Sequence, residues 1–279
     1  MNPNWTQGDI LIDGKRIHYC RTGPAGSGKP AVVLVHGFSD SGLCWQTVAE
    51  ELETDYDVVM PDARGHGLSE RVQRDEKLDM PADLAGVIRA LGLQRPVVGG
   101  HSMGAGEAAL LGARFPEIVG GLFLEDPPWW QPANDDFRPG RRMEGSQLGQ
   151  WALSLPARSL RELLDECHAE HPSWPETDAL RWCEGKKQLD PNIVYTDNDF
   201  TGDWRQVSAA VACPALLITA DTALGGIVTP ELAAAVVAEN PNFRVAHIAG
   251  VGHHVRFAGH AAYMHAVRTF IDAIAVQQV

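Results

Sequence analysis

Residues 96–115 read PVVGGHSMGAGEAALLGARF, and this stretch decides the fold. It begins as an apolar segment typical of a buried strand, passes through the pentapeptide GHSMG at 100–104, and continues as an Ala- and Leu-rich helix. The pentapeptide matches G-x-S-x-G, in which a sharp turn between a strand and a helix presents a serine. Its two glycines leave room for that turn, because glycine has no side chain. The stretch therefore predicts a nucleophilic serine at Ser102, where the helix dipole favours negative charge.

The alternation of strand, turn and helix recurs along the chain. Short apolar segments rich in β-branched residues, separated by helical stretches, indicate a parallel sheet that is buried on both faces. These segments lie at 31–35, 57–60, 96–100, 121–124, 215–219 and 243–248. Residues 9–19 predict a hairpin about the Asp13-Gly14 turn. Helices are expected at 80–93, 102–115, 229–240 and 260–276.

Residues 127–210 interrupt this alternation with prolines, polar helices and no clear buried strand. Six of the eight tryptophans lie there, at positions 129, 130, 151, 174, 182 and 204. We expect this stretch to be a helical cap, inserted after the sixth strand, over the carboxyl ends of the strands, where ligands bind. Residues 1–126 and 211–279 then form the core. Because Trp129 and Trp130 directly follow a strand end, we expect both to contact the substrate.

Four segments resemble the α/β-hydrolase superfamily, and the resemblance covers essentially the whole chain. They are HGF at 36–38, PDARGHGLS at 61–69, GHSMG at 100–104 and GVGH at 250–253. The resemblance implies an α/β-hydrolase fold, with a mostly parallel eight-stranded sheet flanked by helices and a helical cap after strand 6. It also implies a serine esterase or lactonase that needs neither a metal nor an organic cofactor.

The resemblance assigns roles around the serine. A serine hydroxyl needs a base within hydrogen-bond reach, and His253 of the GVGH segment is the candidate, since imidazole titrates near neutral pH. The backbone amides of Phe38 and Met103 would form the oxyanion hole that stabilises a tetrahedral intermediate. His36 and Gly37 belong to the same loop and are expected beside the substrate, with His36 bracing the loop rather than acting as a base.

The acid that orients His253 has two candidates. The superfamily usually carries it after the seventh strand in a G-x-x-D pattern, but here Ala223 takes that position and Asp221 is the only carboxylate in the loop before Glu231. Some members, including certain dehalogenases and lactonases, carry it at the end of the sixth strand, 24 residues after the nucleophile, which corresponds to Asp126. The sequence leaves both open, with a slight preference for Asp126, and either keeps the order Ser, Asp, His.

The serine at the centre of the GHSMG turn also restricts the reaction. Haloalkane dehalogenases and epoxide hydrolases of this fold use aspartate there, so Ser102 argues against both. We expect hydrolysis of a small-molecule carboxylic ester or lactone with an apolar or aryl group, through an acyl-enzyme. Carbon–carbon bond hydrolysis, haloperoxidase-like perhydrolysis and acyl transfer remain alternatives on the same residues. A ligand receptor of this fold with slow turnover is the alternative outside the enzymes.

Composition limits the partners. The 279 residues carry 36 acidic and 23 basic side chains, a formal net charge of −13, which disfavours nucleic acid and anionic membranes. No apolar run reaches the length of about 18 residues that a membrane span needs. The first ten residues do not resemble a secretory signal, and five cysteines without a CxxC motif favour reduced thiols. We therefore expect a cytoplasmic location; a homodimer is compatible with the sequence.

Overall fold

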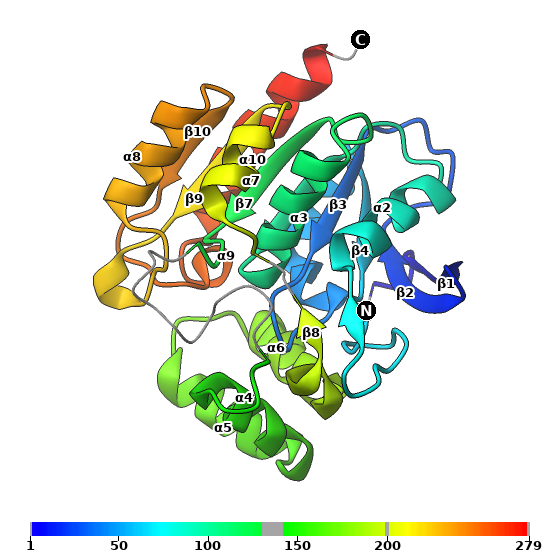
Figure 1. Ribbon diagram of the computed structural model, residues 1–279, viewed down its shortest axis with the longest axis vertical. Helices are drawn as coiled ribbons and strands as arrows, with labels where there is room; N and C mark the ends of the chain where they lie inside the picture. The colour runs from blue at the N-terminus through cyan, green and yellow to red at the C-terminus, as the bar shows by residue number, and fades with distance from the viewer. Residues whose placement is uncertain (1, 130–141, 199–200, 278–279) are drawn as a thin grey trace.

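A computed structural model describes residues 2–129, 142–198 and 201–277. Its centre is an eight-stranded sheet in the order β1-β2-β4-β3-β6-β7-β9-β10 (Figure 1). The strands are β1 (Thr6–Ile12), β2 (Lys15–Arg21), β3 (Ala31–Val35), β4 (Asp57–Pro61), β6 (Val97–His101), β7 (Gly121–Glu125), β9 (Ala215–Thr219) and β10 (Phe243–His247). The pairs β1–β2 and β2–β4 are antiparallel, and every pair from β4 to β10 is parallel. The predicted fold class is confirmed.

Helices cover both faces of the sheet, which is why its central strands are apolar along their whole length. Figure 1 looks onto the face covered by α2 (Met80–Ala90), α3 (Met103–Arg114) and α8 (Pro230–Glu239). The other face packs against α1 (Gln46–Leu52) and α10 (His260–Gln277). Each face has its own hydrophobic core. None of the helices in the described part of the chain is both long and apolar enough to cross a lipid bilayer.

The helix boundaries follow local signals. Asp79 caps α2 by accepting a hydrogen bond from the amide of Ala82. The helix ends two residues before Gly92, whose φ of 66° lies in the left-handed region, so it is shorter than the sequence predicts. Thr229 caps α8 in the same way, with Pro230 at the first position, as the sequence predicts.

Between β7 and β9 the described chain forms α4 (Gln147–Ser154), α5 (Leu160–Glu170), α6 (Glu176–Gln188) and α7 (Trp204–Ala210). Helices α4, α5 and α6 lie together at one end of the sheet (Figure 1), and we call them the cap helices. Helix α6 contacts η1 (Gly42–Trp45), which follows the carboxyl end of β3. Helix α7, although within the predicted cap, packs on α3 and α8 beside the sheet. The domain boundaries themselves stay a prediction.

One small sheet lies apart from the main one. It pairs β5 (Lys77–Leu78) with β8 (Asp197–Asn198) in parallel. The pairing ties the chain after the cap helices to the segment before α2.

Candidate active site

Ser102 lies at the turn between β6 and α3, with φ 51° and ψ −119°. A non-glycine residue in this conformation stores about 1–3 kcal/mol of strain, so the surrounding structure must hold it. A Cβ added to Gly100 would lie 2.2 Å from the carbonyl oxygen of Gly104, and one added to Gly104 would lie 2.3 Å from that of Val35. The two glycines of the motif therefore permit close backbone contacts that keep the serine on a tight turn.

His253 lies in the loop after β10, and its Nδ1 donates a hydrogen bond to Oδ2 of Asp126 across 2.6 Å. Asp126 directly follows β7 and is fully buried. Its φ of 44° suits aspartate, which tolerates the left-handed region better than most residues. The carboxylate also accepts hydrogen bonds from the amides of Ile227 and Val228. With the proton of His253 fixed on Nδ1, its Nε2 is left as the acceptor of the ring.

Asp221, the other candidate acid, lies elsewhere. One of its oxygens is 3.0 Å from Nε2 of His247, and the other accepts a hydrogen bond from the amide of Gly250 at 2.7 Å. It therefore secures the start of the loop that carries His253 and does not bind the imidazole. The structure brings Asp126 to His253 and places Asp221 apart.

The loop after β3 (residues 36–41, here called the Phe38 loop) borders the cavity into which the serine opens. Phe38 borders the same cavity as Ser102 and Met103. Met103 is the first residue of α3, where an amide has no partner within its own helix. Both expected oxyanion-hole residues thus border the cavity of the serine.

His36 and Gly37 are the first two residues of this loop. Nδ1 of His36 donates to the carbonyl of Gly37 at 2.8 Å, and Nε2 accepts from the amide of Ala63 at 3.0 Å. A Cβ on Gly37 would lie 2.7 Å from Nδ1 of His101, so only glycine fits there. Neither residue is among the described residues that line the cavity, so the expected substrate contact is replaced by bracing of the loop.

The serine opens into a cavity of about 260 Å³ between the sheet and the cap helices. Its apolar wall comes from the loops after β3 and β9, the segment after β7, the start of α3 and the cap helices: Phe38, Ile227, Pro128, Met103, Leu148, Trp151 and Trp182. Its polar wall adds Ser39, Lys186, His101, His253 and His254. No group of three His, Cys, Asp or Glu side chains suited to a metal ion occurs among the residues that the structure describes.

A family model described as the alpha/beta hydrolase fold matches residues 30–258. The chain belongs to this family. It is 31% identical over 269 residues to the N-formylmaleamate deformylase of Pseudomonas putida, which covers 95% of this chain and 96% of that protein. It is 24% identical to the 2-(acetamidomethylene)succinate hydrolase of Mesorhizobium japonicum, over 89% and 90% of the two chains. The crystal structure of an N-formylmaleamic acid deformylase from Pseudomonas putida superimposes with a TM-score of 0.75 at 24% identity, over 94% and 99%.

Buried charges of alternating sign join the loops of this α/β hydrolase. The amide and guanidinium of Arg256 both donate to Glu125, the last residue of β7. Arg256 also lies 3.9 Å from Asp40, which is part of the Phe38 loop. Asp40 in turn accepts from Nζ of Lys186, on α6, at 2.6 Å. This chain of charges links the loops that carry Asp126 and His253 to the Phe38 loop and to the cap helices.

Two further histidines of the hydrolase surround His253. Nε2 of His101 donates to the carbonyl oxygen of His253 at 3.2 Å, and the two rings lie 4.7 Å apart. The ring of His254 lies 5.0 Å from that of Trp174 and 4.9 Å from that of His101. Burial holds the pKa of both His101 and His254 well below the usual range, with help from nearby positive groups. Both imidazoles are therefore neutral at neutral pH.

Among the described residues, the tryptophans that border the cavity are Trp151 and Trp182, and Trp129, which the sequence predicts there, is not one of them. Trp129 is 1% exposed and packs in the core with its ring 6.3 Å from that of Phe243. The chain turns after Asp126, so Pro128 faces the cavity while Trp129 faces inward. The structure thus corrects the expected substrate contact of Trp129, and Trp130 lies outside the described residues.

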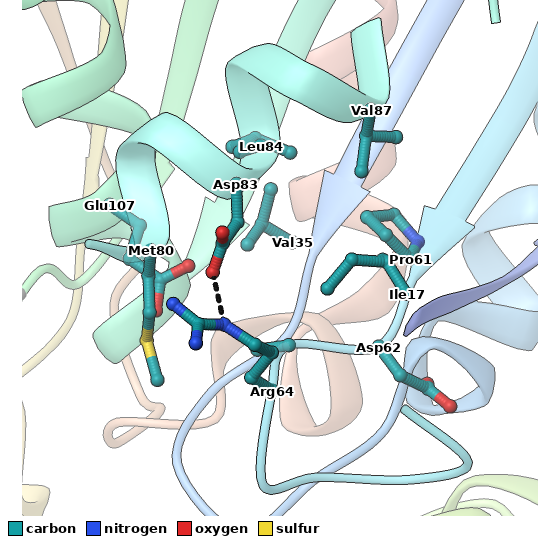
Figure 2. Close-up of a pocket in the computed structure, with 11 residues that line it drawn as sticks. Ile17, Val35, Pro61, Asp62, Arg64, Met80, Asp83, Leu84, Val87 and Glu107 are labelled. Carbon is teal, nitrogen blue, oxygen red and sulfur yellow. Dashed lines mark hydrogen bonds and ion pairs between the residues drawn. The ribbon is translucent and has the colours of Figure 1, made fainter. Parts of the chain in front are cut away.

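A second cavity of about 20 Å³ lies between α2 and the strands β2, β3 and β4 (Figure 2). Arg64 pairs there with Asp83 at 2.6 Å, and Glu107 projects from α3 toward the same space. Its volume suits about one water molecule, so it is not a substrate site.

The sequence does not predict that Lys186 and His254 border the cavity. Lys186 stands beside Lys187 in a polar helix, and nothing in the sequence separates the two. In the structure Lys186 is buried, whereas Nζ of Lys187 reaches the carbonyl of Pro156 at 3.0 Å. Only the position of α6 against the sheet distinguishes them. His254 follows the motif histidine and shares its loop, which is the one signal that points to it.

Proposed function

We propose that this hydrolase cleaves a carboxylic ester or lactone through an acyl-enzyme on Ser102. The observation that supports this most is the 2.6 Å hydrogen bond between His253 and the buried Asp126, in a loop that borders the same cavity as the serine. Nucleophile, orienting acid and base follow β6, β7 and β10, three parallel strands on the same side of the sheet, with β9 between the last two. The carboxyl ends of these strands therefore supply all three reacting groups.

The proposed reaction follows from the roles of these groups. Nε2 of His253 takes the proton of the serine hydroxyl as Oγ attacks the substrate carbonyl. Asp126 keeps the proton on Nδ1 and stabilises the imidazolium that forms. The amides of Phe38 and Met103 stabilise the oxyanion, and His253 then gives its proton to the leaving oxygen. Water, activated by the same imidazole, hydrolyses the acyl-enzyme and regenerates the serine.

A second candidate is hydrolysis of an N-acyl bond. The names of two relatives support it, since one is a deformylase of N-formylmaleamate and the other a hydrolase of 2-(acetamidomethylene)succinate. The first is similar over nearly its whole length. The same steps apply, with His253 protonating a leaving nitrogen in place of an oxygen.

A substrate panel tests both candidates. Aryl and alkyl esters, lactones and N-formyl amides are incubated with the wild-type protein and with Ser102→Ala, and kcat/KM is measured for each. We expect turnover of at least one class by the wild type, none by Ser102→Ala, and labelling of Ser102 by a fluorophosphonate. With p-nitrophenyl acetate we expect a burst followed by steady turnover. A stoichiometric burst that stalls would favour the slow receptor, and activity that survives Ser102→Ala would refute the proposal.

A further inference from the structure

We propose that Lys186 binds a carboxylate of the substrate, so that the enzyme acts on acyl compounds that carry a negative charge. This inference rests on the proposed function and names its substrate class. It comes from the placement of one buried cation at the wall of the cavity.

The ammonium of Lys186 is held in a fixed position. Its side chain is 1% exposed, and Nζ lies 2.6 Å from Oδ1 of Asp40. It also lies 3.7 Å from the centre of the Trp182 ring, a cation–π distance. A buried cation with these partners has little freedom, so the N–H groups that Asp40 does not bind are held in a defined orientation.

The hydrogen-bonding capacity of Lys186 is not used up. An ammonium group has three N–H donors, and Asp40 accepts one of them. The ring of Trp182 covers a second side at 3.7 Å, and the ring of Trp151 lies farther away, at 5.9 Å. Lys186 borders the cavity, whereas Asp40 is not among the described residues that line it. Arg256 stands 3.9 Å from the other oxygen of Asp40, which places that carboxylate between two cations. Of this ion pair, therefore, the cation borders the cavity and the anion does not.

The rest of the described wall does not oppose an anion. None of its residues is Asp or Glu, although the chain carries a net charge of −13. Lys186 is the one Lys or Arg among them, and His101 and His254 add hydrogen-bonding nitrogens. Around the buried side chain of Lys186 the effective dielectric is lower than in water, so a contact between its ammonium and a carboxylate is stronger than in solution. The wall as described therefore selects a carboxylate over an apolar group of the same shape.

Two esters of matched shape test this. Monomethyl glutarate ends in a carboxylate, and methyl 5-methylhexanoate ends in an isopropyl group of similar form. Their binding to the Ser102→Ala protein is measured by titration calorimetry, so that the result does not depend on turnover. We expect the anionic ester to bind about 10–100-fold tighter than the neutral one, the range of a hydrogen bond to a charged group. We expect Lys186→Met to abolish this ratio.

Lys187→Met is the matched control, because it removes the same charge from the neighbouring residue, which is exposed. It should leave the ratio unchanged. If Lys186→Met alone does not fold, the double variant Lys186→Met with Asp40→Asn removes both charges of the pair and must also lose the ratio.

Equal binding of the two esters, binding of neither, or a ratio that survives the loss of Lys186 would overturn the inference and leave the lysine a clamp between α6 and the Phe38 loop. Failure of the proposed function gives a different result: the wild type hydrolyses no member of the substrate panel, whatever the calorimetry shows.

Discussion

Nδ1 of His253 lies 2.6 Å from Oδ2 of Asp126, which is buried and accepts two further hydrogen bonds from backbone amides. Asp221 instead accepts a hydrogen bond from the amide of Gly250. The two aspartates that the sequence leaves open therefore have different partners, and the difference can be measured.

Asp126→Asn should reduce kcat by about 10⁴-fold, because an amide no longer stabilises the imidazolium or keeps the proton on Nδ1 of His253. The measurement is steady-state turnover of the best ester of the panel, with circular dichroism to show that the variant is folded.

Asp221→Asn is the matched control, since it makes the same chemical change in the loop next to His253. We expect a loss of less than about tenfold, because this substitution weakens one support of the loop and leaves the ring contact intact. The reverse order of effects would exclude Asp126 as the orienting acid.

Ser102→Gly should melt above Ser102→Ala. Both variants lack the hydroxyl and are inactive, but only glycine adopts φ 51° without strain. Relief of about 1–3 kcal/mol exceeds the added chain entropy of glycine, about 0.5–1 kcal/mol. A net gain of about 1 kcal/mol corresponds to about 2–4 °C in Tm for a chain of this size. Differential scanning calorimetry checks this, and an equal or lower Tm for the glycine variant would show that the turn stores no strain.

Glu107 should make stability depend on pH. Burial, and then the charge of Asp83, holds its pKa well above the usual range. Oε1 of Glu107 has no hydrogen-bond partner among the described residues. Above the ordinary pKa of about 4.3 the unfolded chain releases this proton while the folded protein keeps it, so its contribution to stability falls as pH rises, by about 1.4 kcal/mol per unit.

Glu107→Gln removes that dependence while keeping the shape of the side chain. We expect the variant to gain Tm relative to wild type as the pH increases from 4.5 to 8, with little difference at the acidic end. Thermal unfolding across this range is the measurement. Glu231→Gln, at an exposed position of α8, should show no such divergence. A constant difference between Glu107→Gln and wild type would contradict the buried neutral carboxyl.

The sequence predicts the centre of the sheet well because β3, β4, β6, β7 and β9 are short segments that are buried almost along their whole length. It also identifies Ser102 and His253, since the strained turn and the histidine loop each require glycines at fixed positions next to the functional residue. It does not decide between Asp126 and Asp221, because both follow strands and the choice depends on which strand end faces the imidazole. Nor does it distinguish Trp129 from the tryptophans that border the cavity. The chain turns after β7, and a shift of one residue in that turn decides whether a side chain faces the cavity or the core.

The contact between the cap helices and the Phe38 loop is the feature least visible in the sequence, and Gly185 shows why. A Cβ at this position of α6 would lie 2.9 Å from Cα of Asp40 and 3.1 Å from the amide nitrogen of Ser41. Those atoms are backbone, so they do not move aside as a flexible side chain would. Glycine therefore lets α6 approach closely enough for Lys186 to reach Asp40.

Gly185→Ala should destabilise the protein by about 1–3 kcal/mol, the usual cost of overpacking, although alanine favours a helix by about 0.5–1 kcal/mol over glycine. Because the Phe38 loop carries part of the expected oxyanion hole, we expect kcat/KM to fall by about 10–100-fold, as a small misplacement of reacting groups does. Gly145→Ala, before α4, is the control: an added Cβ there meets nothing within 4 Å, so both Tm and kcat/KM should stay close to wild type. Equal behaviour of the two variants would mean that α6 does not depend on this close contact to hold the loop.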